Sequence, residues 1–220
     1  MAKSCAPHFS SRSPQTKEPL KIGVLISGSG TNLQAIIDAI EKGALNAEIV
    51  LVLSSRPDAY GLQRAQQAGI PTVSMNRELY LDPALANEVI ATELVHAGAE
   101  YVIMAGYMRM ITSEVLSVFP DRVVNLHPAL LPSFKGAHAI EEAYEAGVKI
   151  TGITVHFANE EYDKGPIIAQ AAVEVLESDT LESLEQKIHA QEHKLYPKVI
   201  QLLSEGRVTI DAHRRVHIAF

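Results

Sequence analysis

The 220-residue chain lacks tryptophan and contains one cysteine, Cys5. A single cysteine excludes an internal disulfide and a zinc site built from cysteines, and it is typical of a reducing compartment such as the cytoplasm. Aromatic residues make up only 5% of the sequence, which leaves little to build a stacking platform for single-stranded nucleic acid. Basic residues number 19 against 26 acidic ones, and the net charge of −7 argues against binding to phosphate backbones.

Long hydrophobic runs are also missing, because runs such as residues 101–106 fall far short of the roughly 18 apolar residues of a membrane helix. Hydrophobic residues still make up 47% of the chain, enough to bury a core. We expect residues 21–220 to form one domain. Residues 1–20 are rich in serine and proline and have no apolar core of a secretory signal, so we expect a disordered extension, with a transit peptide as the alternative.

Apolar runs alternate with amphipathic segments from Lys21 onward. The runs predict strands at 22–27, 48–53, 71–74, 101–105 and 118–125, and the segments predict helices at 31–42, 58–69 and about 83–97. Such alternation predicts an α/β fold with a Rossmann-like, largely parallel twisted sheet and helices on both faces.

The pattern changes after Lys149. Two adjacent strand-like runs, 151–157 and 167–175, predict an antiparallel C-terminal strand pair appended to the sheet. An amphipathic helix is expected over about 180–204, kinked or broken by Pro197. Residues 210–220 predict a late edge strand.

A glycine-rich turn, GSGTNL at 28–33, follows the first predicted strand and opens a helix. Free N–H groups at a helix start bind anions. The third glycine of a dinucleotide fingerprint is replaced by Leu33, and no carboxylate ends the next strand to hold a ribose. The turn therefore favours one phosphate of a small substrate, bound by Gly30, Thr31 and Asn32; a plain tight turn is the alternative.

Two polar residues, Asn125 and His127, stand at the expected carboxyl end of a strand, where ligands bind in open α/β sheets. They are two positions apart and project to one side of the extended chain. The asparagine could donate to an oxyanion, and the histidine could donate or transfer a proton at neutral pH. Asp163 is one candidate carboxylate to hold a protonated histidine, and spacing alone does not select it over its acidic neighbours in 159–165.

The sequence HAQEH at 189–193 fits the H-x-x-E-H zinc pattern, with His189 and His193 one helical turn apart. Zinc needs a third protein ligand, and the pattern also arises by chance, so we assign no metal. Glu192 is instead a candidate acceptor for substrate hydroxyls.

Several ordered blocks resemble one family. The chain resembles the folate-dependent formyltransferases, and among them the phosphoribosylglycinamide formyltransferases (glycinamide ribonucleotide transformylases), over about residues 21–206. The blocks are ISGSGTNLQ (26–34), GYMR (106–109), NLHPALLP (125–132), VHF (155–157), DKGPII (163–168) and QEH (191–193) followed by Tyr196 and Pro197.

The resemblance implies transfer of a formyl group from 10-formyltetrahydrofolate, as co-substrate, to the amine of glycinamide ribonucleotide in purine biosynthesis. It implies Asn125, His127 and Asp163 as the catalytic trio, and Gly30, Thr31, Asn32 and Glu192 as contacts of the ribonucleotide. A folate pocket is implied at Met108, Arg109, Met110, Ile111 and Tyr162, as is a cis bond between Leu131 and Pro132. Lys135 departs from the family, which commonly has proline there.

Other members of the family, and one unrelated class, remain as alternatives. A formyltetrahydrofolate deformylase has the same trio but usually a regulatory domain of roughly 80 residues ahead of it, which 20 residues cannot form. A methionyl-tRNA formyltransferase needs a basic surface and a further C-terminal domain. A non-catalytic folate or nucleotide binder has no need of Asn125 with His127. We expect a cytoplasmic enzyme, monomer or homodimer, that acts on small molecules and binds neither membranes nor nucleic acid.

Overall fold

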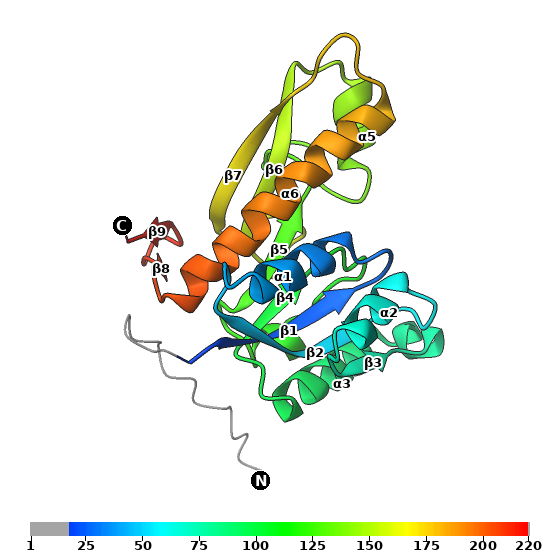
Figure 1. Ribbon diagram of the computed structural model, residues 1–220, viewed down its shortest axis with the longest axis vertical. Coiled ribbons are helices and arrows are strands. Elements are labelled where there is room, and N and C mark those ends of the chain that lie inside the picture. The colour runs from blue at the N-terminus through cyan, green and yellow to red at the C-terminus, as the bar shows by residue number, and fades with distance from the viewer. Residues whose placement is uncertain (1–17, 220) are drawn as a thin grey trace.

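A computed structural model describes residues 18–219. Its strands are β1 (Leu20–Ile26), β2 (Ala47–Ser54), β3 (Thr72–Ser74), β4 (Tyr101–Met104), β5 (Val123–His127), β6 (Ile150–Phe157) and β7 (Ile167–Glu174). They form one sheet in the order β3-β2-β1-β4-β5-β6-β7 (Figure 1). The pairs from β3 to β5 are parallel, whereas β6 and β7 are antiparallel. The predicted fold class is confirmed.

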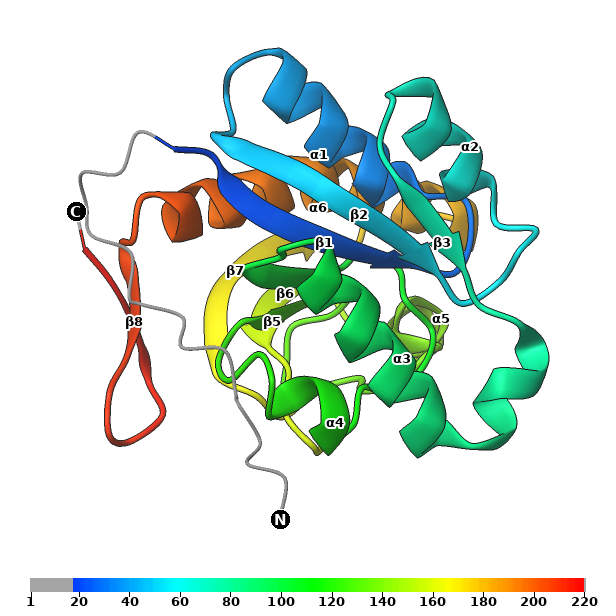
Figure 2. The same cartoon turned by 90° about the horizontal axis from the view of Figure 1, so that it is seen from below.

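Helices cover both faces of the sheet. On one face lie α1 (Thr31–Glu41), α2 (Tyr60–Gln67) and α6 (Leu181–Ser204), and on the other lie α3 (Pro83–His96) and α4 (Ser113–Leu116), as Figure 2 shows. Side chains of β1 alternate between two cores: Ile22, Val24 and Ile26 pack with the first group of helices, and Leu25 packs with the second. Burial on both faces explains the nearly continuous apolar run of this strand.

The long C-terminal helix α6 continues through Pro197 without a break. Of the two predicted outcomes, a break is wrong, because packing fixes the helix on both sides of the proline, and a kink stays a prediction. Thr180 and Ser183 form a capping box at its start. Tyr196 is fully buried, and its hydroxyl lies 3.1 Å from the Met104 carbonyl oxygen and 2.9 Å from that of Val124. The helix is therefore anchored to two neighbouring strands of the sheet.

The strand predicted over 118–125 begins only at Val123. Residues 118 and 119, at the start of the predicted strand, instead continue the turn after α4, where the Phe119 amide donates to the Val115 carbonyl at 2.9 Å. Pro120 and Asp121, with a φ of 54°, then turn the chain. An apolar run cannot distinguish a short helix from a strand. The helix α5 (Ala139–Glu145) and the 3-10 helix η1 (Arg77–Leu81) were not predicted either.

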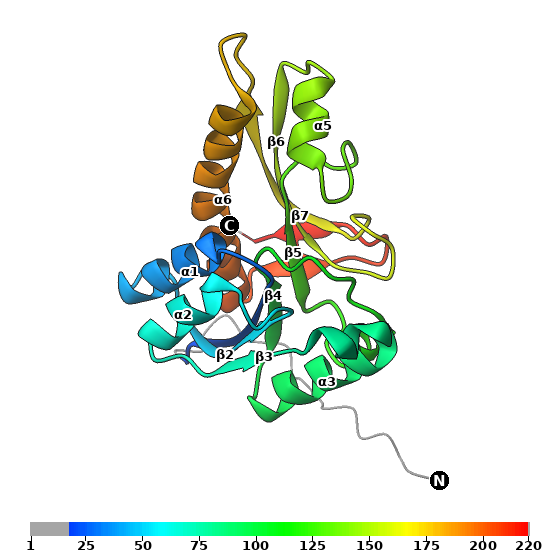
Figure 3. The same cartoon turned by 90° about the vertical axis from the view of Figure 1, so that its right-hand side faces the viewer.

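The predicted edge strand over 210–220 is also wrong. Residues there contribute to a separate antiparallel pair, β8 (Val208–Ile210) with β9 (Val216–Ile218), which lies at the middle height of the molecule (red in Figure 3). An Asp211–Arg215 backbone hydrogen bond of 2.9 Å helps close the turn between them. The disorder expected for residues 1–20 falls mostly on residues 1–17, outside the described range; Leu20 begins β1.

Candidate active site

The glycine-rich turn joins the end of β1 to the start of α1. Gly30 has a φ of 72°, and a Cβ there would lie 2.6 Å from the Cα of Gly61, so only glycine fits this position. The turn is fastened to α2, because the Gly61 amide donates to the Gly28 carbonyl at 3.1 Å and the Arg64 guanidinium to that of Ser29 at 2.9 Å. No side chain caps α1. Its first amides therefore remain for an anion.

A cavity of about 450 Å³ opens in front of this turn. Its walls come from the turn itself, the end of β5, the segment after β4, the 136–137 and 162–163 segments, and α6. The lining includes the turn residues 27–32, Arg56, residues 105–108, residues 125–128, Gly136, Ala137, Tyr162, Asp163, His189 and Glu192. The cavity thus brings together all the residues expected to bind the ribonucleotide and all three of the expected catalytic trio.

Glu192 lies in this cavity wall as a buried carboxylate with two partners. Asn32 donates to its Oε2 through Nδ2 at 2.9 Å, and His189 Nδ1 lies 2.9 Å from the same oxygen. The hydrogen bond to Glu192 raises the pKa of His189 despite the opposing effect of its partial burial. The side chain of Asn32 is therefore already bound to Glu192. Its backbone amide, in the first turn of α1, is the group left to contact a phosphate.

The end of β5 carries Asn125 and His127 on one side of the strand. His127 is buried, and both of its ring nitrogens face acceptors. Nε2 lies 2.7 Å from the Phe134 carbonyl oxygen, and Nδ1 lies 3.5 Å from Oδ2 of Asp163. Each ring nitrogen therefore has an oxygen toward which a proton on it would point.

Asp163 differs from its acidic neighbours by being buried, whereas Glu160 and Glu161 are exposed. Its Oδ2 accepts a hydrogen bond of 2.9 Å from the Gly136 amide, and its Oδ1 lies 3.7 Å from His156 Nε2. Burial by itself would raise the pKa of Asp163. The contacts with His156, the Gly136 amide and His127 outweigh burial and lower it. Of the three acidic residues in 159–165, Asp163 alone is buried, and it lies beside His127.

Sequence reasoning gave no role to His156, which touches two members of the trio. It lies directly opposite Asn125 in the antiparallel register of β5 and β6. Its Nδ1 lies 2.9 Å from the Phe157 carbonyl, and its Nε2 lies 3.1 Å from Asn125 Nδ2. The two residues are 31 positions apart, so only the pairing of the two strands could have revealed this contact.

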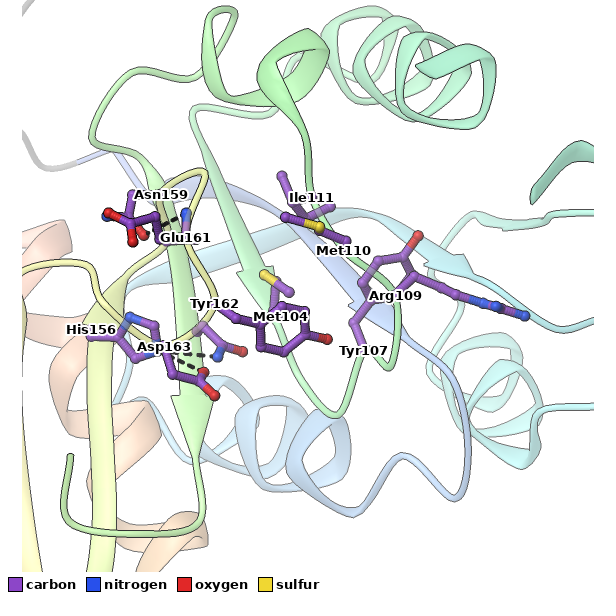
Figure 4. A pocket seen from close by; sticks show the side chains of 12 residues that line it. Met104, Tyr107, Arg109, Met110, Ile111, His156, Asn159, Glu161, Tyr162 and Asp163 are labelled. Carbon is purple, nitrogen blue, oxygen red and sulfur yellow. Dashed lines mark hydrogen bonds and ion pairs between the residues drawn. The ribbon is translucent and has the colours of Figure 1, made fainter. Parts of the chain in front are cut away.

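A second, smaller pocket shares Asn125 and Asp163 with the larger cavity. Figure 4 shows its side chains, with His156 and Asp163 at one end and Arg109, Met110 and Ile111 at the other. Arg109, Met110, Ile111 and Tyr162, four of the five residues expected to bind folate, line it together with Met104 and Tyr107. The fifth, Met108, lines the larger cavity instead, and its amide donates to Ser27 Oγ at 2.8 Å. Asn125, Asp163, Tyr107 and Tyr162 line both spaces. Two of the three residues of the expected catalytic trio, Asn125 and Asp163, therefore line both spaces, and His127 lines the larger one.

Tyr107 was not singled out by sequence, although it forms the wall between the two spaces. Its hydroxyl lies 2.9 Å from that of Tyr80, whose ring is covered by the Arg109 guanidinium at 4.8 Å. Burial raises the pKa of Tyr107 far above its ordinary value, so the phenol stays neutral. The Leu131–Pro132 bond is cis, as the resemblance implied.

Within residues 18–219, no group of three or more histidine, cysteine or acidic side chains is placed to hold a metal ion. His189 and His193 stack with ring centres 6.5 Å apart, but the first is bound to Glu192. No helix in the described part of the chain is long and apolar enough to cross a membrane.

Comparison with known proteins gives consistent matches. The profile of the formyl transferase family matches residues 20–200. A phosphoribosylglycinamide formyltransferase of Haemophilus influenzae is 41% identical over 190 residues, covering 86% of this chain and 90% of the relative. The trifunctional purine biosynthetic protein adenosine-3 of Bos taurus is 40% identical over 196 residues, which is 89% of this chain but 19% of that protein. The chain therefore spans between 14% and 20% of the length of the trifunctional relatives.

Solved structures agree with the sequence matches. The crystal structure of glycinamide ribonucleotide transformylase 1 from Symbiobacterium toebii superimposes with a TM-score of 0.90 at 45% identity. It covers 96% of this chain and all of the other.

Proposed function

The chain belongs to the formyl transferase family, and we propose that it transfers the formyl group of 10-formyltetrahydrofolate to the amine of glycinamide ribonucleotide. The products are formylglycinamide ribonucleotide and tetrahydrofolate, a step of purine biosynthesis. The single observation that carries the proposal is the position of Asn125 and Asp163 on the wall between two binding spaces. Two substrates held in these spaces would meet at the trio.

The ribonucleotide occupies the larger cavity in this proposal. Its phosphate binds the backbone amides of Gly30, Thr31 and Asn32, where the helix dipole of α1 adds favourable electrostatics. Glu192, already oriented by Asn32 and His189, accepts hydrogen bonds from the ribose hydroxyls. These contacts anchor the far end of the substrate and direct its amine toward β5.

The folate occupies the smaller pocket, between residues 109–111 and Tyr162, with Met108 at the boundary to the larger cavity. The exposed side chains of Met108, Met110 and Tyr162 offer apolar surface to an aromatic ring system. This places the formyl group against Asn125 and His127.

The reaction needs no covalent enzyme intermediate. The substrate amine attacks the formyl carbon, a C–N bond forms, and the carbonyl oxygen becomes an oxyanion. Asn125 Nδ2 and the His127 imidazolium donate to that oxygen, with His127 exchanging the Phe134 carbonyl for it. Asp163 keeps His127 cationic. The bond to folate N10 then breaks, and the proton lost by the amine passes to N10 through water. Holding both substrates in register supplies a large part of the rate enhancement.

A transfer assay tests this function. Purified protein is incubated with 10-formyltetrahydrofolate and glycinamide ribonucleotide, and formylated product is measured by mass; a parallel reaction offers water as the only acceptor. We expect product only with the ribonucleotide. His127→Ala should lose most of the turnover while still binding folate. His217→Ala is the matched control, because His217 is an exposed histidine paired with Asp211 in the β8–β9 pair. Equal formyl loss to water in the parallel reaction would contradict the proposal.

We further propose that residues 21–220 form one domain that works without a metal. We also propose that the protein acts in the cytoplasm and that its partners are small molecules alone. The family profile, which matches residues 20–200, supports a single domain over that range. Gel filtration with light scattering distinguishes a monomer from a homodimer, the two states that we expect.

A further inference from the structure

The loop between β5 and α5 touches two of the three proposed catalytic side chains through its backbone. The Phe134 carbonyl accepts from His127 Nε2 at 2.7 Å, and the Gly136 amide donates to Asp163 Oδ2 at 2.9 Å. Both loop residues have positive φ, 49° for Phe134 and 95° for Gly136. These two groups point correctly only in one loop conformation, so whatever fixes the loop also orients His127 and Asp163.

One buried hydroxyl holds the start of this loop. Thr154 is fully buried and lies directly opposite His127 in the β5–β6 register. Its Oγ1 donates to the Ala129 carbonyl at 2.7 Å and accepts from the Leu131 amide at 3.0 Å. A third bond comes from Gln170 Nε2 at 3.0 Å. One donor and two acceptor positions are the full capacity of a hydroxyl, and all are used.

Two further contacts join the loop to the antiparallel strands. Gln170 on β7 also donates to the Leu131 carbonyl at 3.0 Å. Gly152, two positions before Thr154 on the same side of β6, leaves room for the loop, because a Cβ there would lie 2.8 Å from Leu130 Cδ2. The face of β6 is therefore fitted to residues 129–131 in both shape and polarity.

We propose that Thr154 is a positioning residue of the active site, which orients His127 and Asp163 by fixing the conformation of the 128–136 loop. It touches neither substrate space, since it is absent from the lining of both cavities. Its effect reaches the reaction only through the Phe134 carbonyl and the Gly136 amide. The kinetic part of the test described below rests on the proposed function.

The same strand offers a matched control. Thr151 is also buried on β6, with 1% of its surface exposed, but its Oγ1 has no hydrogen-bond partner among the described residues. Valine has nearly the shape of threonine, so Thr151→Val removes a buried hydroxyl that binds nothing. Thr154→Val removes one that makes three bonds, and Thr154→Ser keeps those bonds while losing a methyl group.

The experiment compares kcat, KM and the pH profile of kcat for the three variants and the wild type, below the unfolding temperature of each. We expect Thr154→Val to lower kcat about 10–100-fold, because displacement of catalytic groups by about 1 Å can cost a factor of 10². KM for glycinamide ribonucleotide should stay within about twofold of the wild-type value. The glycine-rich turn, which we propose to bind the phosphate, follows β1 and not β5 or β6. The pH profile should shift in Thr154→Val alone, and Thr154→Ser should restore most of the rate.

An NMR measurement tests the role of Thr154 without relying on the proposed transferase activity. The buried His127 Nε2–H, bonded to Phe134, should give a slowly exchanging proton signal in the wild type and Thr151→Val, and this signal should be lost in Thr154→Val. A wild type without transferase activity would overturn the proposed function, and the NMR comparison would still decide the role of Thr154.

Three results would overturn the role of Thr154: an unchanged rate and pH profile in Thr154→Val, equal losses in Thr154→Val and Thr151→Val, or an unchanged His127 signal. If Thr154→Val does not fold, Gln170→Met replaces it. That variant removes only Nε2 bonds from an exposed position, and we expect a smaller effect in the same direction.

Discussion

The two halves of the sheet contribute to the active site in different ways. The parallel half, with β1 and β2, offers backbone amides at the start of α1 and needs a glycine turn to expose them. The antiparallel half, with β5 and β6, offers buried side chains that hold one another in place across two strands and two loops. In the proposed function, anchoring of the phosphate thus depends on one continuous segment, whereas catalysis depends on segments far apart in the chain.

This comparison predicts that changes in the antiparallel half reduce kcat and changes in the glycine turn raise KM. A glycine-turn variant that lowered kcat alone, or a variant of the antiparallel half that raised KM alone, would contradict this difference.

The largest effect is expected from Asp163→Asn. The amide keeps the shape but removes the charge that stabilises the His127 imidazolium, so kcat should fall by about 10²–10³, the cost typical of losing one electrostatic group in a catalytic site. KM for the ribonucleotide should change little. Steady-state kinetics measure both parameters, and Asp179→Asn, which removes a carboxylate paired with Lys187 at the start of α6, is the control. A kcat within threefold of the wild type would remove Asp163 from the mechanism.

Gly30→Ala, in the glycine turn of the parallel half, should have the next largest effect, and we expect it on KM. Its Cβ would meet the Cα of Gly61 at 2.6 Å, and its φ of 72° is unfavourable for alanine, so the turn must move and KM should rise about tenfold or more. Gly43→Ala is the control, because Gly43 has a φ of 69° but nothing near its Cβ position. It should lose about 1–2 kcal/mol of stability, with KM unchanged. An equal rise of KM in both variants would count against a phosphate site at the turn.

A smaller effect is expected on acid stability. The pKa of Asp163 is lower in the folded protein than in the unfolded chain. Ionised Asp163 therefore stabilises the fold above its unfolded pKa of about 4, and this stabilisation is lost as the pH falls through its native pKa. Urea titrations from pH 6 to 3 should show a shallower loss of unfolding free energy in Asp163→Asn than in the wild type. Parallel curves for the two proteins would mean that Asp163 has no lowered pKa.

The smallest effect is expected from chelation. Neither half of the site offers three metal-ligating groups among the described residues, so incubation with EDTA followed by desalting should leave kcat unchanged. Activity lost on chelation and restored by zinc would assign a function to His189 and His193 that we do not propose.

Local sequence determined the parts of this protein that depend on neighbouring residues. Apolar runs and the alternating pattern of strands and helices predicted the fold class, and the order of Gly28, Gly30 and Thr31 predicted an anion site at a helix start, because these features need only local backbone geometry. Asn125 and His127 could be paired because they are two positions apart on one strand.

Only the tertiary structure decided which distant groups meet. Asp163 is distinguished from Glu160 and Glu161 by burial against two histidines, and the role of His156 depends on its register opposite Asn125. The same reason explains the error at Pro197, where packing of the helix on both sides of the proline overrode its local tendency to break a helix. The error in residues 118–122 has another cause, because an apolar run does not distinguish a helical turn from a strand. Hydrogen bonding and burial depend on distance in space, and a single sequence encodes that distance only through the folded chain.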